Sequence, residues 1–181
     1  MTEHIALCGA IRADQGEAVD CLLETAAARL KQQGVRVAGV LQRRAAHGDT
    51  CCADMGLELI STGETIEISQ PLGSGSQGCR LDPRGLAEIT ACLLSELEDG
   101  PDLLFLNRFG KGEQEGEGFR QLIGRAVELS IPVLTAVRPP YLDAWRLFTG
   151  DLSEELPPML DPVLDWCLKV TSPAQRIAAN A

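Results

Sequence analysis

The segment 5–41 constrains the fold more than any other part of the chain, because its apolar period changes from strand-like to helical and back. The apolar run Ile5–Ile11 predicts a strand, and a polar turn follows it. A helix is then indicated by apolar side chains at i, i+3, i+4, i+7, i+8 and i+11, which are Val19, Leu22, Leu23, Ala26, Ala27 and Leu30. Gly34 ends this helix, and Val35–Leu41 predicts a second strand. Such a β-α-β unit builds parallel sheets.

The middle of the chain is less regular. Leu57–Ile60 and Thr65–Ile68 predict a β-hairpin around a short polar turn, within a loosely patterned stretch, 45–78, that we interpret as an insertion. Asp82 and Pro83 are residue types that favour an N-cap and the first helical position, so a helix should begin there and end before Gly100-Pro101.

The second half returns to alternating strands and helices. Leu103–Leu106 predicts a central strand covered on both faces, and Asn107–Gly118 a charged, glycine-rich connection. Then come a helix from Phe119, a strand over Pro132–Val137, short helices around Trp145 and over Leu164–Val170, and a weakly structured C-terminus, 171–181. We therefore expect one α/β domain, 1–181, with a three-layer, parallel-sheet, Rossmann-like and P-loop-like fold.

Composition limits the partners. The chain has 181 residues, 45% of them apolar, and a formal net charge of −10, so long-range attraction to nucleic acid or to an anionic membrane is not expected. No signal segment and no apolar run long enough to span a bilayer is present, and we expect a cytoplasmic protein without membrane insertion. A small oxyanion or a nucleotide is the expected ligand, and the sequence leaves a homo-oligomer open.

The seven cysteines do not form a strong metal-binding pattern. His47, Cys51 and Cys52 lack the spacing of a zinc site, and no metal is assigned. We expect reduced thiols, with Cys79 in a glycine-rich loop as the reactive one. The other four lie in apolar stretches and are expected in the core: Cys8, Cys21, Cys92 and Cys167.

Three segments should share the edge of the sheet where the strands end, because loops and helix N-termini converge there. They are Gly9–Gly16 with Arg12, Asn107–Gly118, and Arg138–Tyr141. The first resembles a Walker A loop, but its spacing is too long, and Glu17-Ala18 replace the lysine and the hydroxyl residue. It is equally consistent with an ordinary β-α turn and with a modified anion loop.

Two further segments carry candidate anion donors. Asn107, Arg108 and Lys111 follow the central strand, where acidic residues would organise magnesium in a hydrolytic P-loop enzyme. A solvated charged loop is the alternative for this segment. The second is a glycine- and serine-rich stretch that either forms an anion-binding nest or is a flexible surface loop; its candidates are Gly73, Ser74, Gly75, Ser76, Gly78, Cys79 and Arg80.

Several of these elements together resemble an uncharacterised bacterial domain-of-unknown-function family, carried near molybdenum-uptake and nitrogenase genes and sometimes labelled as molybdenum transporter accessory proteins. The similarity runs from Ile5 to about Val170, and the Asn107–Lys111 run is its most specific part. The other matching elements are Gly39–Gln42, Cys79–Asp82, Glu113 and Gly116–Arg120. The family is in turn similar to P-loop nucleoside triphosphatases that carry Asp-Glu-Ile-Gly-Lys at the corresponding strand end, from which Asn107-Arg108 departs.

The resemblance implies an oxyanion-binding accessory protein of molybdenum metabolism, with molybdate or a related oxyanion bound without hydrolysis. Its implied partners are molybdenum-uptake or nitrogenase-related proteins. Molybdate is a tetrahedral dianion, and arginine, lysine and backbone amides are the donor types it requires. Two alternatives stay open: a nucleoside triphosphatase with a non-standard P-loop, in which Lys111 or Arg108 replaces the missing lysine, and an adaptor whose loops contact a partner protein.

Overall fold

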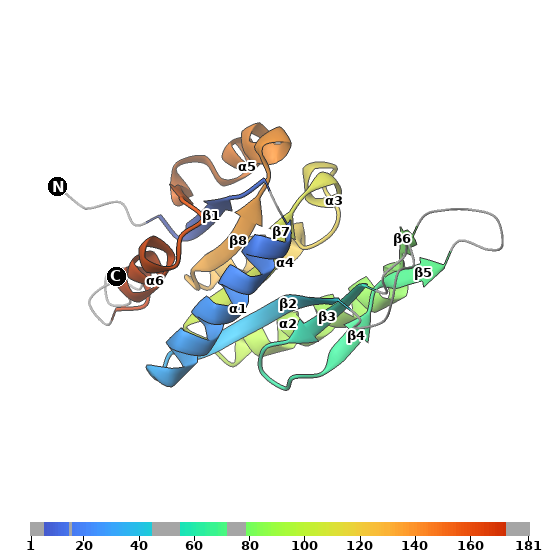
Figure 1. The fold of residues 1–181 in the computed structure, drawn as a ribbon, viewed down its shortest axis with the longest axis horizontal. Helices are drawn as coiled ribbons and strands as arrows, with labels where there is room; N and C mark the ends of the chain where they lie inside the picture. Colours follow the sequence, from blue (N-terminus) through green and yellow to red (C-terminus); the bar gives the residue numbers. More distant parts are fainter. Residues whose placement is uncertain (1–5, 15, 45–54, 72–78, 173–181) are drawn as a thin grey trace.

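A seven-stranded sheet forms the centre of the fold in the computed structural model, which describes residues 6–14, 16–44, 55–71 and 79–172 (Figure 1). Its strands, in order across the sheet, are β4 (Thr65–Glu67), β3 (Met55–Leu59), β2 (Val37–Arg44), β7 (Leu103–Phe109), β8 (Val133–Val137), β1 (Cys8–Arg12) and β9 (Ser153–Leu156). The five strands from β2 to β9 pair in parallel, and β3 and β4 are antiparallel. A separate ribbon pairs β5 (Ser69–Pro71) with β6 (Cys79–Leu81).

Helices cover both faces of this sheet (Figure 1). On one face, α1 (Gly16–Gln32) and α6 (Leu160–Val170) enclose one hydrophobic cluster. On the other face, α2 (Pro83–Glu98), α4 (Arg120–Glu128) and α5 (Leu142–Thr149) enclose a second cluster. The short helix α3 (Lys111–Gln114) follows β7, and two 3-10 turns, Pro139–Tyr141 and Gly150–Leu152, flank α5. The three layers expected from the sequence are therefore present.

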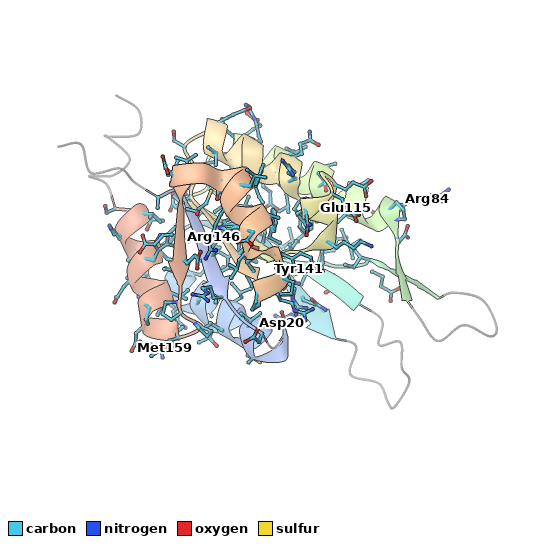
Figure 2. All side chains as sticks on the ribbon, turned by 90° about the horizontal axis from the view of Figure 1, so that it is seen from above. Asp20, Arg84, Glu115, Tyr141, Arg146 and Met159 are labelled. Carbon is cyan, nitrogen blue, oxygen red and sulfur yellow. The ribbon has the colours of Figure 1, made fainter. Side chains whose placement is uncertain are left out.

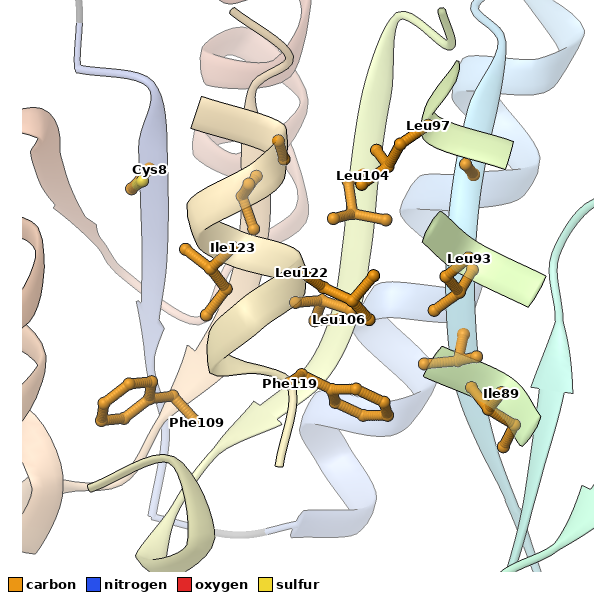
Figure 3. Close-up of a cluster of buried hydrophobic side chains, with 14 of the residues drawn as sticks. Cys8, Ile89, Leu93, Leu97, Leu104, Leu106, Phe109, Phe119, Leu122 and Ile123 are labelled. Atoms are coloured by element: carbon orange, nitrogen blue, oxygen red, sulfur yellow. The ribbon is translucent and has the colours of Figure 1, made fainter. Parts of the chain in front are cut away.

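Local signals determine where α2 begins and which face it buries. The Asp82 carboxylate accepts a hydrogen bond from the Arg84 backbone N–H at 2.9 Å, and Pro83 occupies the first helical position. Figure 3 shows the buried stripe of α2 packed beside β7 and α4; its members are Ile89, Leu93 and Leu97. Burial of each such side chain contributes about 1.5–3 kcal/mol, so this stripe fixes α2 against the sheet.

One glycine is required where β2 meets β7. Gly39 has φ of +125°, and a Cβ there would collide with the Phe105 carbonyl oxygen. The two backbones approach so closely that no larger residue fits. This contact sets the position of β7, and therefore of the Asn107-Arg108 pair at its end.

The structure differs from expectation in three places. β7 continues to Phe109, so Asn107 and Arg108 belong to the strand, and the connection after them contains α3. The strand is longer because it pairs with β8 up to Val137, beyond an irregularity between Leu106 and Arg108. β9 was not expected, since Ser153–Leu156 is a short, polar edge segment. Cys21 was predicted in the core but is exposed on α1, and Cys92 is half-buried.

The hairpin of β3 and β4 forms where it was predicted, and it extends the main sheet by antiparallel pairing of β3 with β2. Residues 45–54 and 72–78 of the expected insertion lie outside the described part of the chain, as do 173–181. In the part described, no helix has the length and apolar content needed to cross a bilayer.

Candidate functional site

The ends of β7, β8 and β1 form one edge of the sheet. These strands are parallel neighbours, and Val137 of β8 is in register with both Arg12 and Phe109. The three segments predicted to share this edge therefore do so. α1 starts at the same edge, on the face opposite α2 and α4, which makes this edge the place where an open α/β sheet binds ligands.

The first loop is not built like a phosphate loop. Gly9 lies inside β1, and a Cβ there would come within 2.9 Å of the Trp166 ring, so this glycine allows packing against α6. β1 continues to Arg12 and α1 begins at Gly16, which leaves only residues 13–15 to connect them. The Ala13 N–H still bonds to the carbonyl of Val137, at 3.3 Å. Much of the segment compared with a Walker A loop, Gly9–Arg12, therefore belongs to the strand.

Arg108 extends from β7 to the start of α1. Its Nη2 atom donates to both carboxylate oxygens of Asp20, each at 3.0 Å. Asp20 lies on α1, as labelled in Figure 2. A Cβ on Gly16 would lie 2.6 Å from the same Nη2 atom, so the guanidinium rests directly against the first residue of the helix. Arg108 thus places a cation, paired with Asp20, at the N-terminus of α1, the kind of position where helix N–H groups bind anions.

The Arg108–Asp20 pair is only partly open to solvent. The Arg108 side chain is 34% exposed and that of Asp20 is 13% exposed. The Nε atom of Arg108 is buried and has no hydrogen-bond partner among the described residues. The Nε–H donor is therefore left for another acceptor. Asp20 was not predicted from the sequence as a site residue, although its position one helical turn after Gly16 places it near the edge where the strands end.

Asn107 lies on the other face of the sheet from Arg108, as neighbouring residues of a strand do, and the irregularity in β7 sets which face each of them takes. Its Nδ2 atom donates to Oε1 of Gln42 on β2 at 2.6 Å, and the residue is only 7% exposed. The two neighbouring residues that were predicted to act together thus face different helical layers.

Two of the other predicted cations, Lys111 and Arg12, are exposed and each lies near a carboxylate. Lys111 is 76% exposed and lies 3.8 Å from the carboxylate of Glu115. Arg12 is 56% exposed and pairs with Glu155 at 3.4 Å.

Glu113 organises the loop after β7. Its carboxylate accepts from the Gly110 N–H at 2.9 Å and from the Phe119 N–H at 3.0 Å. Gly118, with φ of +63°, leaves room for this carboxylate, with which any Cβ would collide. Glu113 is therefore occupied in holding the loop.

Most of the glycine- and serine-rich segment lies outside the part of the chain that the structure describes. Gly73, Ser74, Gly75, Ser76 and Gly78 lie outside the described residues. The backbones of Cys79 and Arg80 belong to β6, in a ribbon that projects from the body of the protein near the start of α2 (Figure 1). His47, Cys51 and Cys52 are also outside the described part, and within that part no group of three metal-binding side chains occurs.

Comparison with known proteins gives the family. The model described as "Protein of unknown function (DUF2478)" matches residues 8–166. The chain belongs to this family. The match includes every described element from β1 to most of α6, and thus both Arg108 and Asp20.

Two further similarities place the DUF2478 chain more broadly. It is 38% identical over 138 residues to the molybdenum import ATP-binding protein ModC 2 of Bradyrhizobium diazoefficiens, covering 76% of this chain but only 15% of that protein. Its fold is similar to the crystal structure of THEP1 from Aquifex aeolicus, with a TM-score of 0.58 at 12% identity, over 91% of this chain and 98% of THEP1. The predicted three-layer, P-loop-like α/β fold is thereby confirmed.

Proposed function

We propose that this DUF2478 chain is an accessory protein of molybdenum metabolism that binds an oxyanion, molybdate in the first place, beside Arg108 and does not hydrolyse nucleotides. The observation that carries the proposal is the Arg108 guanidinium, held by Asp20 against Gly16 at the start of α1. The molybdenum context rests on the 38% identity to ModC 2, of which the chain spans 15%. Cytoplasmic action beside molybdenum-uptake or nitrogenase-related proteins belongs to the same proposal.

The geometry favours binding of an anion. The first N–H groups of α1 have no partner within the helix, and the helix dipole adds partial positive charge there. The Nε atom of Arg108 is a buried donor without a partner in the described part of the chain. Asp20 neutralises the charge of the guanidinium. An oxyanion would accept hydrogen bonds from the N–H groups of Arg108 that are not bonded to Asp20.

The same geometry disfavours hydrolysis. A P-loop enzyme uses a lysine, a hydroxyl residue that holds magnesium, and an acidic residue at the end of the central strand. Here Glu17-Ala18 stand at the start of α1, and Asn107-Arg108 end the central strand. The link over residues 13–15 is also too short to wrap around a phosphate group.

Calorimetry tests the proposal. The wild type is titrated with molybdate, tungstate, sulfate and phosphate, and Arg108→Gln should weaken molybdate binding by about tenfold or more, the worth of one charge-assisted bond. Arg138→Gln is the matched control, since it removes the same charge from the exposed end of β8 at the same sheet edge. The same titrations of Lys111→Ala, Arg12→Gln and Arg80→Gln measure what these cations contribute.

Two results would count against the proposal. Absence of heat with every oxyanion would refute binding. Magnesium-dependent phosphate release from ATP or GTP that Lys111→Ala abolishes would favour the nucleoside triphosphatase instead.

A further inference from the structure

A cavity of about 350 Å³ lies on the α2 side of the sheet. This volume lies in the range of small-molecule sites. Its lining includes Gln42 and Asn107 at the ends of β2 and β7, and four apolar side chains, which are Leu57, Ile68, Leu86 and Phe119. It lies on the face opposite the one occupied by α1, whereas the oxyanion is proposed on the α1 side; Arg108 borders both places.

The Asn107 amide is incompletely bonded. Its Nδ2 atom donates to Gln42 at 2.6 Å, while its Oδ1 atom is buried and has no partner in the part of the chain described. Exchange of the two ends of the amide leaves the opposite atom without a partner, so one unsatisfied atom remains either way. A buried polar atom without a partner destabilises the fold, and a ligand that supplies the missing bond would remove that penalty.

The surroundings of the cavity disfavour an anion as its ligand. Glu113 and Glu117 lie at its border, and the carboxylate of Glu113 is bonded to backbone N–H groups of its own loop. Arg108 also borders the cavity, but its guanidinium is bonded to Asp20. An anion is therefore disfavoured, and the apolar lining with its Asn107–Gln42 edge favours a ligand with apolar faces and hydrogen-bonding groups along one edge.

We propose that this cavity binds an uncharged nucleobase-type heterocycle. A ring N–H would donate to Oδ1 of Asn107, and an adjacent carbonyl would accept from the amide of Gln42. The ring faces would pack against Phe119 and the aliphatic side chains, which is how proteins hold planar heterocycles. This site goes beyond the proposed oxyanion binding and does not depend on it.

Titration with uncharged nucleosides tests the proposal. Inosine and uridine carry the N–H and carbonyl edge, and 1-methylinosine and 3-methyluridine lack the N–H. We expect binding of inosine or uridine, about tenfold weaker binding of its N-methyl analogue, and a similar loss in Asn107→Leu. Leu86→Trp, which fills the cavity from a half-buried position on α2, should abolish binding, while Arg138→Gln should bind like the wild type.

Failure of both nucleosides to bind the wild type at millimolar concentration would overturn the proposal. Equal binding of the methylated and unmethylated nucleosides would also overturn it. Molybdate binding that is absent while inosine or uridine binds would refute the proposed function alone, so the two failures can be told apart.

Discussion

Replacement of Arg108 with methionine tests whether its pair with Asp20 fixes β7 to α1. Removal of one partner from a fully buried pair costs about 3–5 kcal/mol, whereas an exposed pair is worth about 0–1 kcal/mol. With Asp20 13% and Arg108 34% exposed, we expect an intermediate loss of about 2 kcal/mol. Asp20→Asn should cost about 1 kcal/mol, because the amide oxygen still accepts one bond.

The double variant Asp20→Asn with Arg108→Met tests whether the pair itself contributes to stability, because this variant leaves no unpaired charge. We expect it to cost about 1 kcal/mol, less than Arg108→Met alone. Urea unfolding followed by the fluorescence of the buried Trp145 and Trp166 measures these differences. At a slope of about 2 kcal/mol per molar urea, Arg108→Met moves the midpoint by about 1 M. If the double variant lost as much free energy of unfolding as the two single variants together, the interaction between Asp20 and Arg108 would contribute nothing to stability.

Three further predictions follow from single contacts. Gly39→Ala should lower the free energy of unfolding by about 3 kcal/mol or more, because its Cβ would collide with a carbonyl of β7. Gly124→Ala, which has open space around it in α4, should raise the free energy of unfolding by about 0.5–1 kcal/mol. Urea unfolding of both variants measures these changes. The Arg43 guanidinium holds the pKa of Glu58 below its ordinary 4.5, so the unfolding free energy should fall as acid protonates Glu58 below that pH, and Glu58→Gln should flatten this dependence. Burial raises the pKa of Cys8 to about 12, so mass spectrometry after brief alkylation at neutral pH should find the exposed Cys21 modified and Cys8 intact.

Much of the fold could be predicted from local sequence. The Asp82-Pro83 pair and the apolar stripe that follows predict α2 correctly, because capping and helical periodicity act within a few residues. The apolar period of α1 is equally clear, and Gly34, with φ of +82°, ends that helix as expected. Cys21 was placed wrongly because a cysteine is apolar by type, while its position on α1 faces outward.

The candidate site could be predicted only in part. The sequence predicted that Arg108 follows a buried strand, at the edge of the sheet where the strands end. Its partner Asp20 lies 88 residues away, and only the pairing of β7 with β8 and the packing of α1 bring the two together. The irregularity that decides which face Asn107 and Arg108 each take depends on the register of β8, which no local pattern encodes.

The position of a bound tungstate tests the central claim most directly, because tungsten is a strong anomalous scatterer and tungstate is a close mimic of molybdate. Crystals of the wild type soaked in tungstate should show one anomalous peak within hydrogen-bonding distance of the Arg108 guanidinium and the first N–H groups of α1. A peak elsewhere, such as beside Arg80 on β6, or the same peak in crystals of Arg108→Gln, would contradict the assignment of Arg108 as the centre of the oxyanion site.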